Sequence, residues 1–180
     1  MAVRAKTRLP YAWGATADEA DAIYPCDARL GDADEALLRA VDVEAPAGTV
    51  FRWLCQLRVA PYSYDWIDNA GRRSPAQLTP GLEQLAVGQR FMSIFTLIDF
   101  TRDRHITLEI TRPSAVALFG AIVVSYVVTP YGPERCRLVV KLMVRHPRRL
   151  PGSLARHLLP WGDLLMMRKQ LFTLKRYAER

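Results

Sequence analysis

The sequence predicts an α+β domain in which a curved antiparallel β-sheet wraps around a long C-terminal α-helix, with two short helices between the first and second strands. Two patterns support this prediction. Four segments with the composition of strands follow one another in the second half of the chain, separated mainly by short turns. An amphipathic segment, residues 161–180, then closes the chain, and its apolar side requires a sheet to pack against. A chain of 180 residues can bury a core of this size.

The N-terminal part is predicted to contain a short helix followed by the first strand. Thr16 and Glu19 have the spacing of a capping box, so a helix is expected to begin there. Residues 37–44 then alternate with a period of two, and one side becomes polar towards the end, which indicates a strand. We therefore divide the chain into an N-terminal extension packed on the domain, residues 1–35, and the main domain, residues 36–180.

Two helices are predicted to follow this strand. Pro46 is well placed in the first turn of the first helix. Apolar residues then recur at positions i, i+3, i+4 and i+7, and they form one face: Val50, Trp53, Leu54 and Leu57. Residues 62–69 are expected to form the second short helix, which closes at Gly71. Proline and glycine recur over residues 72–88, which predicts a loop.

Four strands are predicted in the second half of the chain, at residues 90–100, 104–111, 118–129 and 135–145. The first and second strands, and the third and fourth, are joined by segments short enough for hairpins, so the members of each pair should run antiparallel. In the last strand, alternate residues from Cys136 to Val144 are all apolar, whereas the other face carries Arg137, Lys141 and Arg145. That pattern predicts one buried face and one solvated face.

The closing helix is expected to bend or restart at residues 160–162, because Pro160 cannot donate a backbone hydrogen bond. One stripe of this helix is predicted to face the sheet: Leu164, Met167, Leu171, Leu174 and Ala178. Leu165 and Phe172 are expected to widen that apolar side. Three residues are expected to face away from the sheet: Lys169, Thr173 and Arg176.

The net charge of +7 does not mark a dedicated binding face. The basic excess lies mainly near the two ends, and no nucleic-acid-binding motif accompanies it, so we predict no specific nucleic-acid partner. A weak contact with an anionic lipid surface stays open. The longest apolar run, residues 115–128, is shorter than a transmembrane helix requires, and no signal sequence is recognised. The sequence therefore predicts a cytoplasmic protein, and it indicates no oligomeric state.

The three cysteines are far apart in the sequence and form no CxxC pair. Neither a disulfide framework nor a metal site is predicted from them. Cys55 and Cys136 lie in apolar segments, where a reduced thiol behaves as a small hydrophobic side chain. The sequence also contains no phosphate-binding loop or dinucleotide fingerprint, so no cofactor is predicted.

Three stretches of the sequence are similar to a known superfamily. The first joins a strand and an Ala-Pro step, residues 41–46, to the helix start at residues 50–54. The second is residues 62–69, and the third lies in the closing helix at residues 166–171 and 174–175. On these stretches the chain resembles the helix-grip superfamily called SRPBCC, which includes START lipid-transfer domains, plant pathogenesis-related allergens and polyketide cyclases.

The resemblance implies a helix-grip fold, and the predicted geometry implies an internal cavity, because one helix cannot fill a concave sheet completely. Cavities of this kind, apolar with a few polar groups, are typical sites for small molecules. The elements expected around the cavity supply the predicted ligand-binding residues: Trp53, Tyr62, Tyr64, Trp66, Phe95, Tyr126, Trp161, Leu164, Met167 and Leu171. The alternative for each ring is ordinary packing in the core.

Candidate catalytic residues are few. Tyr64 and Asp65 are the foremost polar candidates, and His105 could act as a base at the start of a strand. Asp163 is expected to cap the closing helix, where the helix dipole favours an anion. Arg168 lies at the edge of the inward stripe and could meet a carboxylate.

Three functions are compatible with the sequence. The first is the non-catalytic binding or carriage of a hydrophobic small molecule, such as a lipid, a polyketide or an isoprenoid-like compound. The second is an enzyme of the polyketide cyclase or dehydratase type, in which Tyr64, Asp65 or His105 assists proton transfer. The third is an interaction module that uses the basic surface on anionic lipid or nucleic acid.

Overall fold

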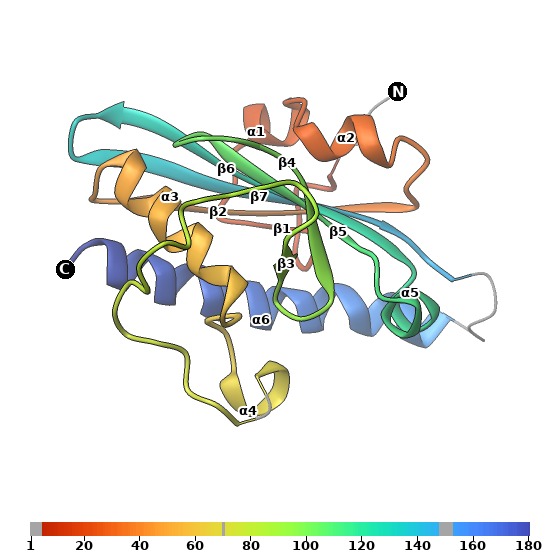
Figure 1. Cartoon of the computed structure of the whole chain (residues 1–180). Coiled ribbons are helices and arrows are strands. Elements are labelled where there is room, and N and C mark those ends of the chain that lie inside the picture. The colour runs from red at the N-terminus through yellow and green to blue at the C-terminus, as the bar shows by residue number, and fades with distance from the viewer. Residues whose placement is uncertain (1–4, 70, 148–152) are drawn as a thin grey trace.

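The computed structural model describes residues 5–69, 71–147 and 153–180. In these residues one mixed, open sheet has the strand order β1-β2-β7-β6-β5-β4-β3 (Figure 1). Its strands are β1 (Ala12–Trp13), β2 (Glu35–Val43), β3 (Arg90–Phe91), β4 (Phe95–Thr101), β5 (His105–Ile110), β6 (Ala121–Gly132) and β7 (Arg135–Arg145). β1 pairs with β2 in parallel, and every other neighbouring pair in this described sheet is antiparallel.

The helices lie on both sides of this sheet. They are α1 (Ala17–Asp21), α2 (Pro25–Arg29), α3 (Ala47–Cys55), the 3₁₀ turn η1 (Gln56–Arg58), α4 (Asp65–Asp68), α5 (Pro113–Phe119) and α6 (Ser153–Ala178). α1 and α2 cover one face, whereas α3 and α6 cover the other (Figure 1). We call the α3–α6 side the inner face and the α1–α2 side the outer face.

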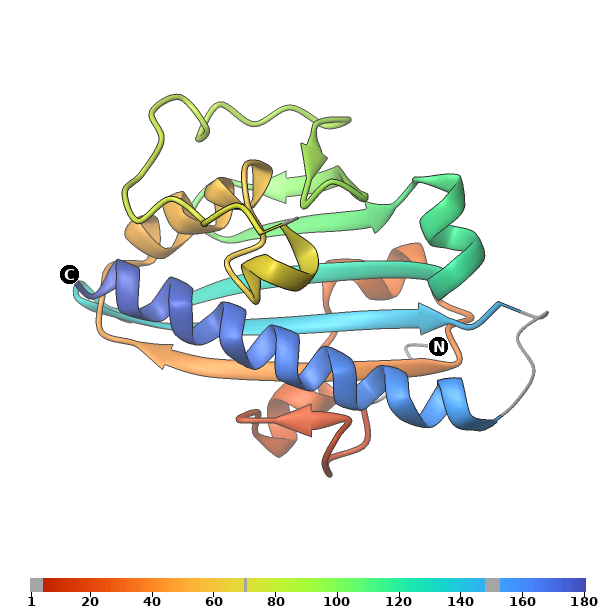
Figure 2. The ribbon, with the colours of Figure 1, turned by 90° about the horizontal axis from the view of Figure 1, so that it is seen from below.

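The inner face holds the larger core, and the predicted grip of the sheet on the last helix is confirmed. α6 crosses the face of the sheet over β2 and β7 (Figure 2). The predicted inward stripe of α6 is buried in full: Leu164, Met167, Leu171, Leu174 and Ala178. Apolar residues of α3 complete this core beside the helix, among them Val50, Trp53 and Leu54.

The outer face is also buried, so the prediction of a solvated face on β7 is wrong. Lys141 and Met143 are almost completely buried, and Arg137 is nearly so. The physical reason is that the segment before β2 packs on this face and forms a second core with it: Ala20, Tyr24, Cys26, Leu30, Val123, Val139 and Met143. The charged side chains remain there because they have buried partners of opposite charge.

Two of the predicted strands have different limits. Residues 90–100 form two strands, because a tight turn separates β3 from β4 and places Met92 and Ser93 at φ 45° and 66°. Residues 118–119, predicted to begin a strand, instead end helix α5. Pro113 starts that helix, and Gly120 ends it with φ at 86°. Proline is common in the first turn of a helix, and glycine is common directly after its last turn.

The last helix was predicted to bend or restart at residues 160–162, and a restart is excluded because α6 is continuous through Pro160. Packing against the sheet outweighs the roughly 3 kcal/mol that proline costs inside a helix. Leu165 and Phe172 are exposed instead of widening the inner side, and Thr173 is buried instead of facing away. The buried side of α6 therefore keeps the predicted stripe but widens towards Gln170 and Thr173 instead of towards Leu165 and Phe172.

Candidate functional site

A cavity of about 170 Å³ remains between α6 and the inner face of the sheet. Its wall is mostly apolar, with a few polar side chains, and comes from three parts of the chain. These parts are the segment after η1, the strands β4, β6 and β7 with the β3–β4 turn, and the middle of α6. Together they provide Pro61, Ser63, Met92, Ile94, Phe95, Val124, Tyr126, Leu142, Asp163, Met166, Met167 and Gln170. Ser63, Ile94 and Met166 are only half buried, so the cavity reaches the surface beside them.

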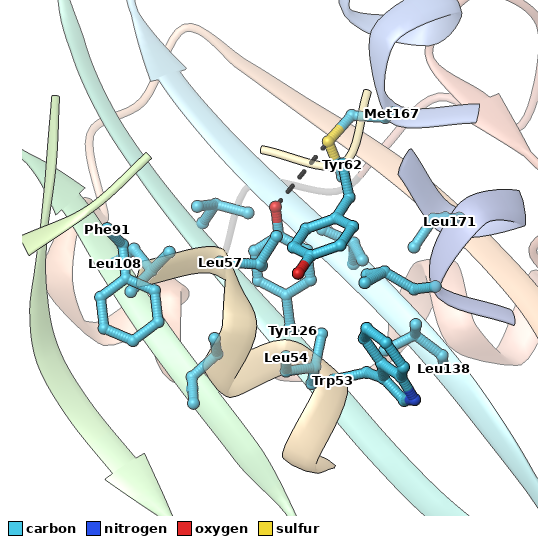
Figure 3. Close-up of a cluster of buried hydrophobic side chains, with 14 of the residues drawn as sticks. Trp53, Leu54, Leu57, Tyr62, Phe91, Leu108, Tyr126, Leu138, Met167 and Leu171 are labelled. Atoms are coloured by element: carbon cyan, nitrogen blue, oxygen red, sulfur yellow. Dashed lines mark hydrogen bonds between the residues drawn. The ribbon is translucent and has the colours of Figure 1, made fainter. Parts of the chain in front are cut away.

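The rest of the groove between sheet and helices is filled by side chains. Trp53 of α3 stacks on Tyr177 of α6, with ring centroids 4.9 Å apart, and Tyr62 meets both rings edge to face. Leu54 and Leu57 fill the space between these rings and the sheet (Figure 3). The remaining cavity is therefore smaller than the roughly 300–1,000 Å³ typical of sites for drug-sized ligands.

A chain of hydrogen bonds crosses the cavity wall at its centre. The hydroxyl of Tyr126 donates to Oε1 of Gln170 at 2.8 Å, and Nε2 of Gln170 donates to the carbonyl of Pro61 at 2.6 Å. The same Nε2 lies 3.4 Å from the sulfur of Met92. Gln170 thus ties a strand, the turn after η1 and the β3–β4 turn to α6.

Burial raises the pKa of Tyr126 far above its ordinary value of 10.0. The phenol therefore keeps its proton at neutral pH. Its single O–H proton is already donated to Gln170, so the Tyr126 oxygen can still accept a hydrogen bond from a hydroxyl group of a molecule in the cavity. Gln170 was not predicted from the sequence, since a lone glutamine on a helix gives no signal until the rotation of that helix is known.

Asp163 gives the cavity one charged group, and its partner lies in the sheet. Nη2 of Arg39 donates to Oδ2 of Asp163 at 2.8 Å, and the Arg39 side chain is only 1% exposed. Nη1 of Arg39 also donates to the carbonyls of Tyr11 and Leu38. Burial raises the pKa of Asp163 above its ordinary 3.8, while the neighbouring Arg39 lowers it in part.

This ion pair corrects the prediction that Asp163 caps the closing helix. α6 begins at Ser153, so Asp163 lies well inside it. Arg168, which was expected to be able to meet a carboxylate, instead lies over the rings of Trp13 and Phe172 on the outside of α6.

The structure distributes the predicted ligand-binding residues over three environments. Phe95, Tyr126 and Met167 line the cavity. Four others are buried without lining it: Trp53, Tyr62, Leu164 and Leu171. Tyr64 is half buried directly before α4 and is not part of the wall.

Trp66 and Trp161 are exposed, by 75% and 50% respectively, and do not face the cavity wall. The structure therefore does not bring these two predicted ligand-binding residues to the cavity. Trp66 belongs to the single-turn helix α4, and Trp161 lies on the solvent side of α6. The sequence around each tryptophan does not specify which side of its helix faces the core.

The three candidate catalytic residues do not form one site, and none of them lines the cavity. Tyr64 and Asp65 lie at the start of α4, where both carboxylate oxygens of Asp65 bind the backbone amide and hydroxyl of Ser74. His105 lies near the outer face of the sheet, with Nε2 3.0 Å from Oδ2 of Asp99. Asp65 therefore holds a loop closed, and His105 has a surface partner.

Two further properties concern the described residues only. Within residues 5–69, 71–147 and 153–180, no group of three or more His, Cys, Asp or Glu side chains is arranged to hold a metal ion. No helix in the same residues is long and apolar enough to cross a membrane.

At the level of sequence, the chain matches no protein-family model and no curated protein. Solved structures do share its fold. The Zhui aromatase/cyclase from Streptomyces sp. R1128 is 18% identical with a TM-score of 0.52, over 81% of this chain and 94% of that chain. The di-domain ARO/CYC BexL from the BE-7585A biosynthetic pathway is 15% identical with a TM-score of 0.51, over 81% of this chain and 46% of that chain.

A third similar structure, from Thermobifida fusca, is 16% identical with a TM-score of 0.50, over 79% of this chain and 92% of that chain. At such identities the likeness establishes the fold. The chain has the helix-grip fold of these aromatase/cyclases, and the fold implied by the resemblance seen in the sequence is confirmed.

Proposed function

We propose that the protein binds a small hydrophobic molecule in the cavity between α6 and the sheet, and that it carries this molecule without changing it. The observation that supports the proposal most directly is the space of about 170 Å³ at the centre of an otherwise well-packed inner core. An apolar cavity of this size can hold an apolar ligand, because its lining gains contacts that it otherwise lacks.

The cavity wall also suggests what the ligand looks like. Val124, Leu142 and Met167 offer apolar contacts, whereas Tyr126 offers one hydroxyl. A ligand with an aliphatic or aromatic body and a single hydroxyl group, which can donate to the Tyr126 oxygen, matches this wall. Its buried part must be small, or the neighbouring side chains must move to admit more of it.

Calorimetric titration with straight-chain alcohols of increasing length tests the proposal. The affinity is expected to rise by about fourfold with each added methylene until the cavity is full, and then to stop rising. Val124→Phe should fill the cavity and abolish binding. Val127→Phe is the matched control, because Val127 lies on the same strand but packs with the outer-face core. Equal binding by wild type and Val124→Phe would contradict the proposal.

An enzyme of the cyclase or dehydratase type is the second candidate. Two observations favour it. The fold is that of the two aromatase/cyclases described above, and the wall of the cavity contains a protonated phenol, Tyr126. In this version the Tyr126 hydroxyl turns away from Gln170 and donates its hydrogen bond to a ketone oxygen of a poly-keto chain. This favours attack of a neighbouring carbon on the carbonyl carbon of that ketone.

The enzyme version is tested with a short poly-β-ketone whose uncatalysed cyclisation products are known. Wild-type protein should change the product distribution, and Tyr126→Phe should return it to that of the uncatalysed reaction. Tyr131→Phe serves as the control, since Tyr131 is exposed in the described structure. An unchanged product distribution with wild-type protein would leave carriage as the function.

A further inference from the structure

The side of α6 that faces away from the sheet carries a second row of apolar side chains, which we call the exposed stripe. Its four members recur at positions i, i+3, i+7 and i+14 of the helix, and their exposed fractions are large: Leu158 60%, Trp161 50%, Leu165 59% and Phe172 43%. A helix that only covers a sheet needs one apolar side, and its other side is normally polar. Packing within the described chain therefore does not account for the exposed stripe.

Cationic side chains accompany this stripe. Arg168, Lys169 and Arg176 are exposed on the same side of α6. None of the three has a carboxylate at ion-pair distance in the part of the chain that the structure describes. Residues 158–178 contain one acidic residue, Asp163, and it pairs with the buried Arg39. The solvent side of α6 is thus apolar and cationic at once.

The short helix α4 lies beside this side of α6. The hydroxyl of Ser63, just before α4, donates to the backbone carbonyl of Met166 at 3.0 Å. Trp66 and Ile67 of α4 are 75% and 54% exposed, and two exposed arginines follow at residues 72–73. Figure 2 shows α4 and α6 together in front of the sheet, and no other described element covers α6 in that view. The two helices therefore form one uncovered surface.

The chemistry of this surface matches an anionic membrane. Tryptophan, phenylalanine and leucine side chains enter the boundary between head groups and acyl chains, while lysine and arginine stay among the head groups. A second copy of this chain does not fit, because two such surfaces would bring like charges together. A nucleic acid does not fit either, since it would pair with the cations and leave the apolar stripe in water.

We infer that the exposed stripe of α6, with α4 beside it, binds the surface of a membrane that contains anionic phospholipids. The helix lies along the plane of that surface. Its apolar side chains enter the head-group boundary, and Arg168, Lys169 and Arg176 contact the phosphate groups. This surface is separate from the inner cavity, so the inference does not depend on the proposed binding function.

Co-sedimentation of the full chain with two kinds of vesicle tests the inference. One kind is phosphatidylcholine alone, and the other also contains about one third phosphatidylserine. The protein should bind the anionic vesicles about tenfold or more tightly than the neutral ones, because several cations lie near the surface. Added salt should weaken this binding by screening those cations. Tryptophan fluorescence should shift to shorter wavelength, because Trp161 leaves water.

The cations are tested by Arg168→Gln/Lys169→Gln/Arg176→Gln. This variant should bind anionic vesicles on the order of 100-fold more weakly, which is about fivefold for each lost charge. A matched control replaces with glutamine three exposed arginines beside β3 and β5, far from α6 in the order of strands: Arg90, Arg104 and Arg112. The control has the same net charge as the α6 variant and should bind nearly as wild type does.

The exposed stripe is tested by Leu158→Gln/Leu165→Gln. This variant should bind about tenfold more weakly, also at high salt, because apolar burial is not screened. Ile23→Gln/Val87→Gln is the matched control, since both residues are exposed on the outer face of the sheet near α2. Circular dichroism verifies that all four variants are folded.

Three outcomes would overturn the inference. If wild-type protein binds neither kind of vesicle, or both equally, the surface does not recognise an anionic membrane. If Leu158→Gln/Leu165→Gln binds as tightly as wild type, the cations act alone and the stripe does not enter the membrane. If wild type forms a dimer in ultracentrifugation and the stripe variant is a monomer, the surface joins two copies of this chain instead.

Discussion

Lys141 and Asp27 form an ion pair that is buried between the sheet and the N-terminal segment. Nζ of Lys141 lies 2.7 Å from Oδ1 and 2.9 Å from Oδ2 of Asp27, and the Lys141 side chain is 2% exposed. Oδ2 of Asp27 also accepts the backbone N–H of Tyr24, which fixes the start of α2. The pair therefore ties β7 to the helices that cover the outer face.

Breaking this pair should destabilise the protein strongly, because the remaining charge would be buried alone. Lys141→Met is expected to lower the free energy of unfolding by about 3–5 kcal/mol. The double variant Lys141→Met/Asp27→Asn should lose less than Lys141→Met alone, since it leaves no unpaired charge. Urea denaturation followed by tryptophan fluorescence measures both values. A double variant less stable than the single one would contradict this prediction, because it would show that the Asp27 carboxylate stabilises the fold even without Lys141.

The stability contributed by Glu19 should depend on pH. Burial raises the pKa of this carboxyl, but hydrogen bonds from Arg137 and Thr16 lower it more, so its pKa falls below the ordinary 4.5. Nε of Arg137 lies 2.7 Å from Oε1 and its Nη2 3.0 Å from Oε2. Because the folded pKa is the lower one, this contribution is fully present above the ordinary pKa and is lost as the pH falls through the folded pKa.

Comparing wild type with Glu19→Gln in urea at about pH 6 and about pH 3 measures this effect. The variant should be less stable than wild type at the higher pH, and the difference should shrink at the lower pH. Asp18→Asn is the control, since Asp18 lies beside Glu19 on the exposed side of α1. A stability difference that stayed constant with pH would contradict the assignment.

The three cysteines should be unreactive in the folded protein. Burial raises the pKa of Cys26 and of Cys136 to about 11, and that of Cys55 to about 12. Very little thiolate is then present at neutral pH, and the sulfur atoms are shielded from reagents. A chromogenic disulfide reagent should label all three thiols in denaturant and none rapidly without it. Fast labelling of one native thiol would show that its segment opens.

Gly120 should be intolerant of substitution for two reasons. It adopts φ 86°, and a Cβ there would collide with the backbone carbonyl of Arg145. Gly120→Ala should therefore lower the free energy of unfolding by about 2 kcal/mol or more. Gly71 has a similar φ of 75° but no neighbour within 4 Å of a Cβ, so Gly71→Ala isolates the cost of the dihedral angle alone. Equal losses in thermal or urea unfolding would remove the collision as a cause.

Much of the fold could be predicted from the sequence because its signals are local. The alternation in β2 and β7, the helix start after Pro46 and the inward stripe from Leu164 to Ala178 depend on neighbouring residues only. The wall residues Phe95, Tyr126 and Met167 were also among the residues selected, since they lie on elements that were expected to surround the cavity. Gln170 and Arg39 were missed, because each becomes part of the site through a partner distant in the sequence.

The sequence by itself therefore determined the order of the long strands and of the last helix, and the faces that pack between them, but it did not predict α2 or α5. The tertiary structure alone decided that the outer face of β7 is dry, since Lys141 is buried only by a segment that precedes the domain's first long strand. It also decided where space remains, because Trp53, Tyr62 and Tyr177 fill one end of the groove, whereas a cavity remains beside Tyr126. Periodicity specifies which side of an element is apolar. Burial and empty volume depend on what lies across from that side, and that is fixed only when all the elements have packed.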